Sequence, residues 1–125
     1  MYLGLVSMLP IAALTLLPAS RDLDVGCAAE WSLPTLGAVE LMANVLLFVP
    51  SVLLLGVAVR RPFMVMLGAS VAAGLIELVQ ALVTALGRSC STNDWLSNSL
   101  GAALGAAIAA LALWLRRSRT ASGLA

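Results

Sequence analysis

Long apolar stretches, separated by short polar segments, are the feature that most constrains how this chain can fold. Of its 125 residues, 62% are hydrophobic and only 10% are charged, whereas a soluble domain carries about 25% charged residues. A helix of about 20 apolar residues is long enough to cross the hydrocarbon core of a bilayer. The sequence therefore predicts an all-α, polytopic integral membrane protein, and its length allows one domain with about four spans.

The apolar runs place the spans of a predicted four-helix transmembrane bundle with a polar extracytoplasmic loop. We expect these spans at residues 2–17, 41–59, 63–86 and 95–115. Together they form one transmembrane domain over residues 1–118, and we expect the tail at 119–125 to be disordered. A signal peptide is the alternative for the first run. The lack of a basic segment before it and the poor cleavage site after it favour a retained span.

Basic residues are distributed unevenly among the segments that join the spans. Five of the seven form what we call the arginine-rich end: Arg60, Arg61, Arg116, Arg117 and Arg119. No acidic residue accompanies them, and five of the six acidic residues lie in or beside the other two segments. By the positive-inside rule the arginine-rich end is cytoplasmic. Both chain termini are then expected in the cytoplasm, and the loops around Cys27 and Cys90 are expected outside.

The second, third and fourth spans each carry polar side chains near their outer ends. An ionisable side chain inside an apolar span is costly and by default marks a functional site. At a rise of about 1.5 Å per residue, the polar residues of the three spans share the outer third of the membrane. We therefore predict an outward-facing polar pocket. Its predicted ligand-binding residues are Asn44, Glu77, Gln80, Arg88, Asp94 and Asn98.

Each of these residues also has a purely structural interpretation. Glu77 is either an acid, base or cation-binding group, or a buried carboxyl whose hydrogen bonds fix helix packing. Arg88 either binds an anion or closes the loop through an ion pair. Asp94 is interpreted as the N-cap of the fourth span. Asn44 and Asn98 are interpreted as interhelical hydrogen-bond partners, with ligand contact as the alternative.

Two of the predicted spans have one face of small residues. In the fourth span the small residues recur every four positions, which predicts close helix contact; they are Ser97, Gly101, Gly105 and Ala109. In the third span the face opposite the small and polar residues is bulky and is expected to meet lipid; it comprises Leu75, Val79, Leu82 and Leu86. Three tryptophans are interpreted as interfacial anchors: Trp31, Trp95 and Trp114.

Only two cysteines are present, and both fall in loops that are expected outside the membrane. That compartment permits disulfide bonds, so we expect a bridge between Cys27 and Cys90. Two unpaired thiols are the alternative.

The sequence lacks the residues and motifs that several kinds of functional site require. It has no histidine, no cluster with metal-ligand spacing, no nucleophile with a histidine base and no glycine-rich phosphate loop. We therefore expect no metal and no cofactor, and nothing indicates nucleic-acid binding. The lipid bilayer is the partner that the composition implies, and no pattern indicates an oligomeric state.

Three motifs together resemble the VanZ-like family of integral membrane proteins. They are the stretch from Asn44 to Pro50, the pair Glu77 and Gln80, and Gly87-Arg88 followed by Asp94, Asn98, Gly101 and Gly105. The chain departs from the family pattern at Ser51, where the family has glycine, and at Ser91, where it has an acidic residue. The family is named for a protein that confers low-level resistance to the glycopeptide teicoplanin. The resemblance therefore implies a bacterial plasma membrane and a cell-envelope role, without a reaction.

Three hypotheses for function follow. The first is a protein that binds a cell-envelope component and contributes to teicoplanin-type antibiotic tolerance; the component is a lipid-linked precursor, a lipid headgroup or a lipophilic glycopeptide. The second is a membrane-embedded enzyme that acts on a lipid-linked envelope molecule, with Glu77 as acid or base. The third is a structural membrane subunit. The missing nucleophile, metal site and second carboxylate favour binding over catalysis.

Overall fold

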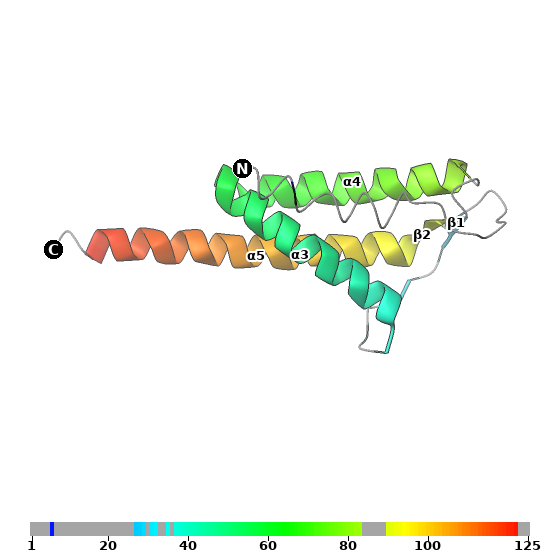
Figure 1. The fold of residues 1–125 in the computed structure, drawn as a ribbon, viewed down its shortest axis with the longest axis horizontal. Helices are drawn as coiled ribbons and strands as arrows, with labels where there is room; N and C mark the ends of the chain where they lie inside the picture. The colour runs from blue at the N-terminus through cyan, green and yellow to red at the C-terminus, as the bar shows by residue number, and fades with distance from the viewer. Residues whose placement is uncertain are drawn as a thin grey trace.

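The computed structural model describes residues 6, 27–29, 31–32, 35, 37–83 and 90–122. This part of the chain is dominated by the helices α3 (Val39–Val59), α4 (Pro62–Leu82) and α5 (Thr92–Ser122). Two short strands, β1 (Cys27–Ala28) and β2 (Cys90–Ser91), lie near the start of α5 (Figure 1).

Within the described residues, these three helices are long and apolar enough to cross a membrane. The helical class is therefore confirmed, and α3, α4 and α5 lie at the positions of the second to fourth predicted spans. The predicted span at residues 2–17 lies outside the described residues apart from Val6. The four-helix bundle consequently stays a prediction.

A tight connection joins α3 to α4. Arg60 has a left-handed backbone with a φ of 58°, and Pro62 occupies the first position of α4, where its missing N–H and fixed φ suit a helix start. The chain reverses direction within these residues, so α3 and α4 are antiparallel neighbours, as the short connection predicts. Figure 1 shows α4 and α5 running side by side, with α3 crossing α5 obliquely.

Small residues on α5 bring α3 into close contact. A Cβ atom added at Gly101 would collide with the carbonyl oxygen of Val45, and one added at Gly105 would lie 2.6 Å from the carbonyl oxygen of Val49. Further along, Ala109 packs at Gly56, where an added Cβ would lie 3.1 Å from its methyl group. The predicted small-residue stripe of α5 is confirmed, and it carries the most extensive helix contact among the described elements.

The two faces of α4 differ as the sequence predicts. Ala73, Glu77 and Gln80 are buried against the other elements. Leu75 and Leu82 on the opposite side expose more than half of their surface. Leu86, the last member of the bulky face, lies outside the described residues. The exposed apolar side is the surface that a bilayer covers.

The helix ends differ from the predicted ones. α4 stops at Leu82 instead of continuing to residue 86: Val83 is not helical, and its N–H bonds the carbonyl of Val79. A run of β-branched residues, Val83 followed by Thr84, disfavours further helix. The fourth predicted span begins earlier and ends later than expected, since α5 starts at Thr92 and reaches Ser122.

α5 therefore extends over Arg119 to Ser122, into the tail that the sequence analysis expects to be disordered. Two hydroxyl groups bond within this part of the helix: Ser118 Oγ donates to the carbonyl of Trp114, and Thr120 Oγ1 donates to that of Arg116. Arginine is itself a good helix former. The helix therefore extends beyond the apolar stretch that predicts it, which ends at Leu115.

Candidate functional site

Glu77 lies on the buried face of α4 and exposes only 7% of its surface. Its Oε2 accepts a hydrogen bond from the backbone N–H of Ser91 at 2.9 Å. Ser91 is the second residue of β2 and immediately precedes α5. A backbone N–H that is partly removed from water needs a hydrogen-bond partner. The carboxyl of Glu77 is that partner, and the hydrogen bond holds the N-terminal end of α5 against α4.

A disulfide bond connects Cys27 to Cys90, with their Cα atoms 4.5 Å apart, which confirms the predicted pairing. The two residues are also partners in the parallel pairing of β1 with β2, and Ala28 is the partner of Ser91. Because α3 and α4 lie between the two cysteines in the chain, two membrane crossings would return it to the side from which it started. The bond therefore agrees with two membrane-spanning helices.

Additional hydrogen bonds fasten the segment around residues 28–32 to the start of α5. The backbone N–H of Ser32 donates to Oδ1 of Asn93 at 2.7 Å. The hydroxyl of Thr92 donates to the carbonyl of Ala28 at 3.3 Å. Sequence reasoning missed Ser32 and Asn93, although a run of serine, threonine, asparagine and aspartate before an apolar stretch is a helix-start signal.

Asp94 does not cap α5, which corrects the prediction. The helix begins at Thr92, and the hydroxyl of Ser91 accepts the N–H of Asn93 at 3.2 Å, which is the capping hydrogen bond. Asp94 lies in the first turn, where its negative charge suits the positive end of the helix dipole. Its Oδ1 instead accepts a hydrogen bond from the side-chain amide of Asn44 at 3.0 Å and so connects α3 to α5.

Asn98 lies one turn beyond Asp94 and exposes only 2% of its surface. Among the described residues, its side-chain oxygen Oδ1 has no hydrogen-bond partner. The hydroxyl oxygens of Ser97 and Ser99 are also buried and without a partner in this part of the chain. Leaving such a group unpaired costs about 1–3 kcal/mol. The acceptor of Asn98 is therefore suited to a donor from outside the described residues.

Contacts between α4 and α5 set the relative register of the two helices. Ser91 lies beside Glu77, and the indole N–H of Trp95 donates to the carbonyl of Ser70 at 3.1 Å. Asn98 is seven residues beyond Ser91, which is about 10 Å along α5. This register places Asn98 beside the middle of α4, about two turns along α5 from the residue that Glu77 contacts.

The predicted site residues consequently form an elongated arrangement along α5. We use the name polar cluster for the described members, which are Asn44, Glu77, Gln80, Asp94 and Asn98. The carboxyl groups of Glu77 and Asp94 are close enough to interact electrostatically, and Gln80 is buried one turn from Glu77. Arg88 lies outside the described residues, so its role stays a prediction. Trp95, interpreted as an interfacial anchor, has a hydrogen-bond partner in α4.

What the polar cluster can do chemically follows from its atoms. Its members offer carboxylate and amide groups, and within the described residues no group of three histidine, cysteine or acidic side chains is placed to hold a metal ion. The described members include no serine or cysteine nucleophile paired with a base. The arrangement is suited to accepting hydrogen bonds and to attracting positive charge.

Comparison with known proteins gives one match. The family model described as VanZ/LLP1 matches residues 5–114, a range that contains α3, α4, both strands, most of α5 and every member of the polar cluster. No curated protein and no solved structure matches the chain. Since the family model covers most of the sequence, the resemblance seen in its motifs is confirmed, and the chain belongs to the VanZ/LLP1 family.

Proposed function

We propose that this protein binds a cell-envelope component at the polar cluster. The observation that carries the proposal is the oxygen of Asn98, which is buried and lacks a hydrogen-bond partner among the described residues. A leucine of similar size at this position would avoid the desolvation penalty. A ligand that donates a hydrogen bond to Asn98 would supply the missing partner.

The composition of the polar cluster indicates the chemistry of the ligand. Glu77 and Asp94 contribute carboxyl oxygens, and Asn98 contributes an amide oxygen about 10 Å further along α5 than Ser91. Such a row of acceptors favours a molecule rich in hydroxyl, amide or ammonium donors. The sugar and peptide parts of a lipophilic glycopeptide or of a lipid-linked precursor have these groups. A bare phosphate would instead need Arg88 to offset the repulsion from the two carboxyls.

Family membership and helices that are apolar enough to span a membrane support the cell-envelope part of the proposal. The proposal also includes a contribution to teicoplanin-type tolerance. In this arrangement the arginine-rich end faces the cytoplasm and the polar cluster faces outward. The outward orientation gives extracellular glycopeptides and exported precursors access to the cluster.

An exchange at Asn98 tests the proposal. The full-length protein is reconstituted in nanodiscs, and binding is measured with a fluorescent teicoplanin derivative and with a lipid-linked disaccharide–peptide. Asn98→Leu removes the acceptor, whereas Asn98→Asp keeps an acceptor oxygen. We expect Asn98→Leu to weaken binding about five- to ten-fold, in line with the loss of one hydrogen bond. Asn98→Asp should bind more tightly than Asn98→Leu.

Thermal unfolding of the same variants separates binding from structure. If Asn98 serves a ligand, Asn98→Leu leaves the melting temperature equal or higher, because an unpaired polar group has been removed. If Asn98 serves the fold, Asn98→Leu lowers the melting temperature while binding of both probes is unchanged. That second result would overturn the proposal.

A structural membrane subunit is the second candidate, and the Glu77–Ser91 hydrogen bond favours it. This bond gives Glu77 a role in the fold without any ligand. Glu77→Gln discriminates among the candidates, since the amide keeps an acceptor oxygen but removes the charge. An enzyme that uses Glu77 as acid or base would lose turnover, a binding protein would bind more weakly, and a structural subunit would be nearly unaffected.

A further inference from the structure

The arginine-rich end contains a cavity that the polar cluster does not explain. It is an open surface cavity with a volume of about 460 Å³, and the described residues that line it are exposed residues of α5: Ala112, Leu115, Arg116, Arg119 and Thr120. These residues lie three, four, seven and eight positions beyond Ala112, so their backbone positions share one face of the helix. This face exists because α5 continues beyond its apolar stretch to Ser122.

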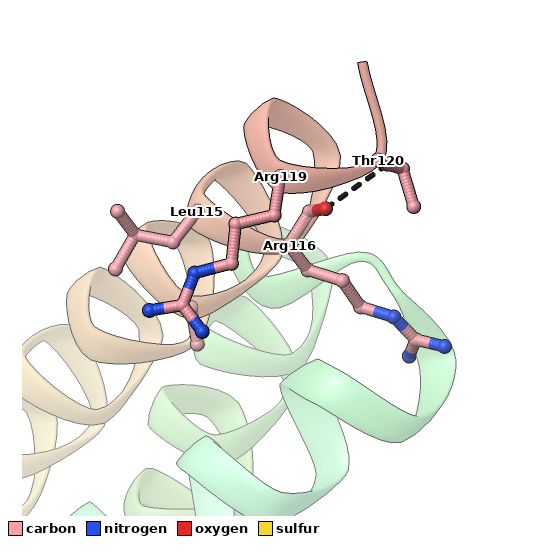
Figure 2. A pocket seen from close by; sticks show the side chains of 5 residues that line it. Leu115, Arg116, Arg119 and Thr120 are labelled. Atoms are coloured by element: carbon pink, nitrogen blue, oxygen red, sulfur yellow. Dashed lines mark hydrogen bonds between the residues drawn. The ribbon is translucent and has the colours of Figure 1, made fainter. Parts of the chain in front are cut away.

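Figure 2 shows how the lining side chains lie. Arg119 extends back beside Leu115, so its guanidinium group stands next to an apolar side chain, and Arg116 extends along another side of the helix. The hydroxyl of Thr120 donates to the carbonyls of Arg116 and Arg117 at 3.0 and 2.9 Å. That hydroxyl is therefore engaged by the helix itself, and the guanidinium groups are the donors that remain for a ligand.

The charge at this end is unbalanced. All five arginines of the arginine-rich end are exposed, and none forms an ion pair with a residue that the structure describes. The acidic residues among the described positions are Glu40, Glu77 and Asp94, which lie toward the opposite ends of their helices. Guanidinium groups bind phosphate oxygens through paired, charge-assisted hydrogen bonds. The cavity is therefore complementary to a phosphate group.

The apolar surface next to the cavity indicates which phosphate compound fits. Ile108, Leu111 and Leu115 are exposed and recur at helical spacing on α5, leading from the cavity toward the centre of the helix. An acyl chain can lie along this strip while its headgroup contacts Arg119. A free phosphate ion has no apolar part that could pack on this strip. A juxtamembrane basic residue contributes about 1 kcal/mol to binding at an anionic membrane surface.

We propose that the face of α5 formed by Ala112, Leu115, Arg116 and Arg119 is a binding site for the headgroup of an anionic phospholipid. Its acyl chain packs along Ile108 and Leu111. This site lies at the opposite end of the molecule from the polar cluster, and it depends neither on the ligand proposed there nor on Arg88.

Lipid retention measures this site directly. The full-length protein is purified in a mild neutral detergent, mixed with phosphatidylglycerol or with phosphatidylcholine, and studied by native mass spectrometry. We compare Arg119→Gln with Arg117→Gln, because the two variants lose the same charge and only Arg119 lines the cavity. We expect phosphatidylglycerol to be retained over phosphatidylcholine. Arg119→Gln should reduce this retention about five-fold, which corresponds to about 1 kcal/mol, and Arg117→Gln should reduce it less than two-fold.

Other outcomes would overturn the proposal. Equal losses in the two variants would mean that net charge alone attracts the lipid, without a defined site. Equal retention of the two lipids would exclude recognition of an anionic headgroup. Displacement of phosphatidylglycerol by inorganic phosphate as effectively as by excess phosphatidylglycerol would show that the apolar strip contributes nothing. Because both arginines are exposed, neither substitution disturbs the packed part of the fold, and circular dichroism checks that helix content is unchanged.

Discussion

The carboxyl of Glu77 accepts the backbone N–H of Ser91 at 2.9 Å, and this bond sets the level at which α5 begins beside α4. Ser91 is also bridged to β1 through its strand pairing with Ala28. One buried side chain thereby positions a helix, a strand pair and the disulfide next to it. The most polar residue of α4 is thus part of the architecture around the polar cluster.

Replacing Glu77 by leucine should destabilise the protein. The partly buried N–H of Ser91 would lose its acceptor, which costs about 1–3 kcal/mol. Glu77→Gln keeps an acceptor and should cost less. Unfolding monitored in detergent by circular dichroism measures both variants, with Leu75→Ala on the exposed face of α4 as the control. Equal stability of Glu77→Leu and the parent protein would show that the bond contributes nothing.

Removing the disulfide should lower stability. The bond closes a loop with a sequence separation of 63 residues, and loop-closure entropy for such a length corresponds to about 4 kcal/mol in the chain-entropy model. We expect the double variant Cys27→Ser/Cys90→Ser to unfold at lower denaturant concentration than the parent protein and to be insensitive to reductant. Alkylation of an unreduced sample provides the check, since two free thiols would contradict the bond.

Adding a methyl group at Gly101 should separate α3 from α5. The new Cβ would collide with the carbonyl of Val45, and overpacking of this kind costs about 1–3 kcal/mol. Gly68→Ala is the matched control, because a Cβ at Gly68 meets nothing within 4 Å and alanine favours a helix. Melting temperatures of the two variants should therefore move in opposite directions. A neutral Gly101→Ala would contradict the close helix contact.

The hydrogen bond between Asn44 and Asp94 should appear as coupling in a double-mutant cycle. Interhelical hydrogen bonds in membrane proteins average about 0.6 kcal/mol and reach about 1.7 kcal/mol. The cycle uses Asn44→Ala, Asp94→Ala and the double variant, with unfolding free energies as the readout. A second cycle pairs Asn44→Ala on α3 with Ser118→Ala on α5. Asn44 contacts the first turn of α5 and Ser118 lies toward its other end, so this cycle should be additive. Coupling of equal size in both cycles would argue against a direct bond.

The membrane orientation is a prediction from charge and has a direct test. With the arginine-rich end in the cytoplasm, a reporter fused after Ser122 should be active if it functions in the cytoplasm and inactive if it requires export. Replacing Arg116, Arg117 and Arg119 by glutamine weakens the charge bias and should increase the fraction with inverted orientation. An exported C-terminal reporter in the parent protein would reverse the assignment of the polar cluster to the outside.

Sequence alone was sufficient to predict the elements whose signals are local. The apolar runs located α3, α4 and α5, and the four-residue spacing of Gly101 and Gly105 identified the face that meets α3. The number and placement of Cys27 and Cys90 gave the disulfide. In each case a repeated spacing, or the expected location of both cysteines outside the membrane, is sufficient for the prediction. The structure then shows which residues each element contacts.

The rest depends on how separate segments meet, which no local pattern encodes. Strands of two residues, as in β1 and β2, are too short to show alternation. Asp94 is not the N-cap, because α5 begins two residues before it, at Thr92. The contact of Ser91 with Glu77 sets that starting position. The separation of Glu77 from Asn98 follows from the register of α4 against α5. Counting residues from the ends of the predicted spans instead places both side chains in the outer third of the membrane.

The disulfide also has a consequence for the order of events during biosynthesis. Cys90 leaves the ribosome after both α3 and α4 have been synthesised, so the covalent link to Cys27 can form only once this helical hairpin exists. Two thiols on opposite sides of a bilayer cannot react with each other. In pulse-labelled cells, the time at which this disulfide forms would therefore report when insertion of the hairpin is complete.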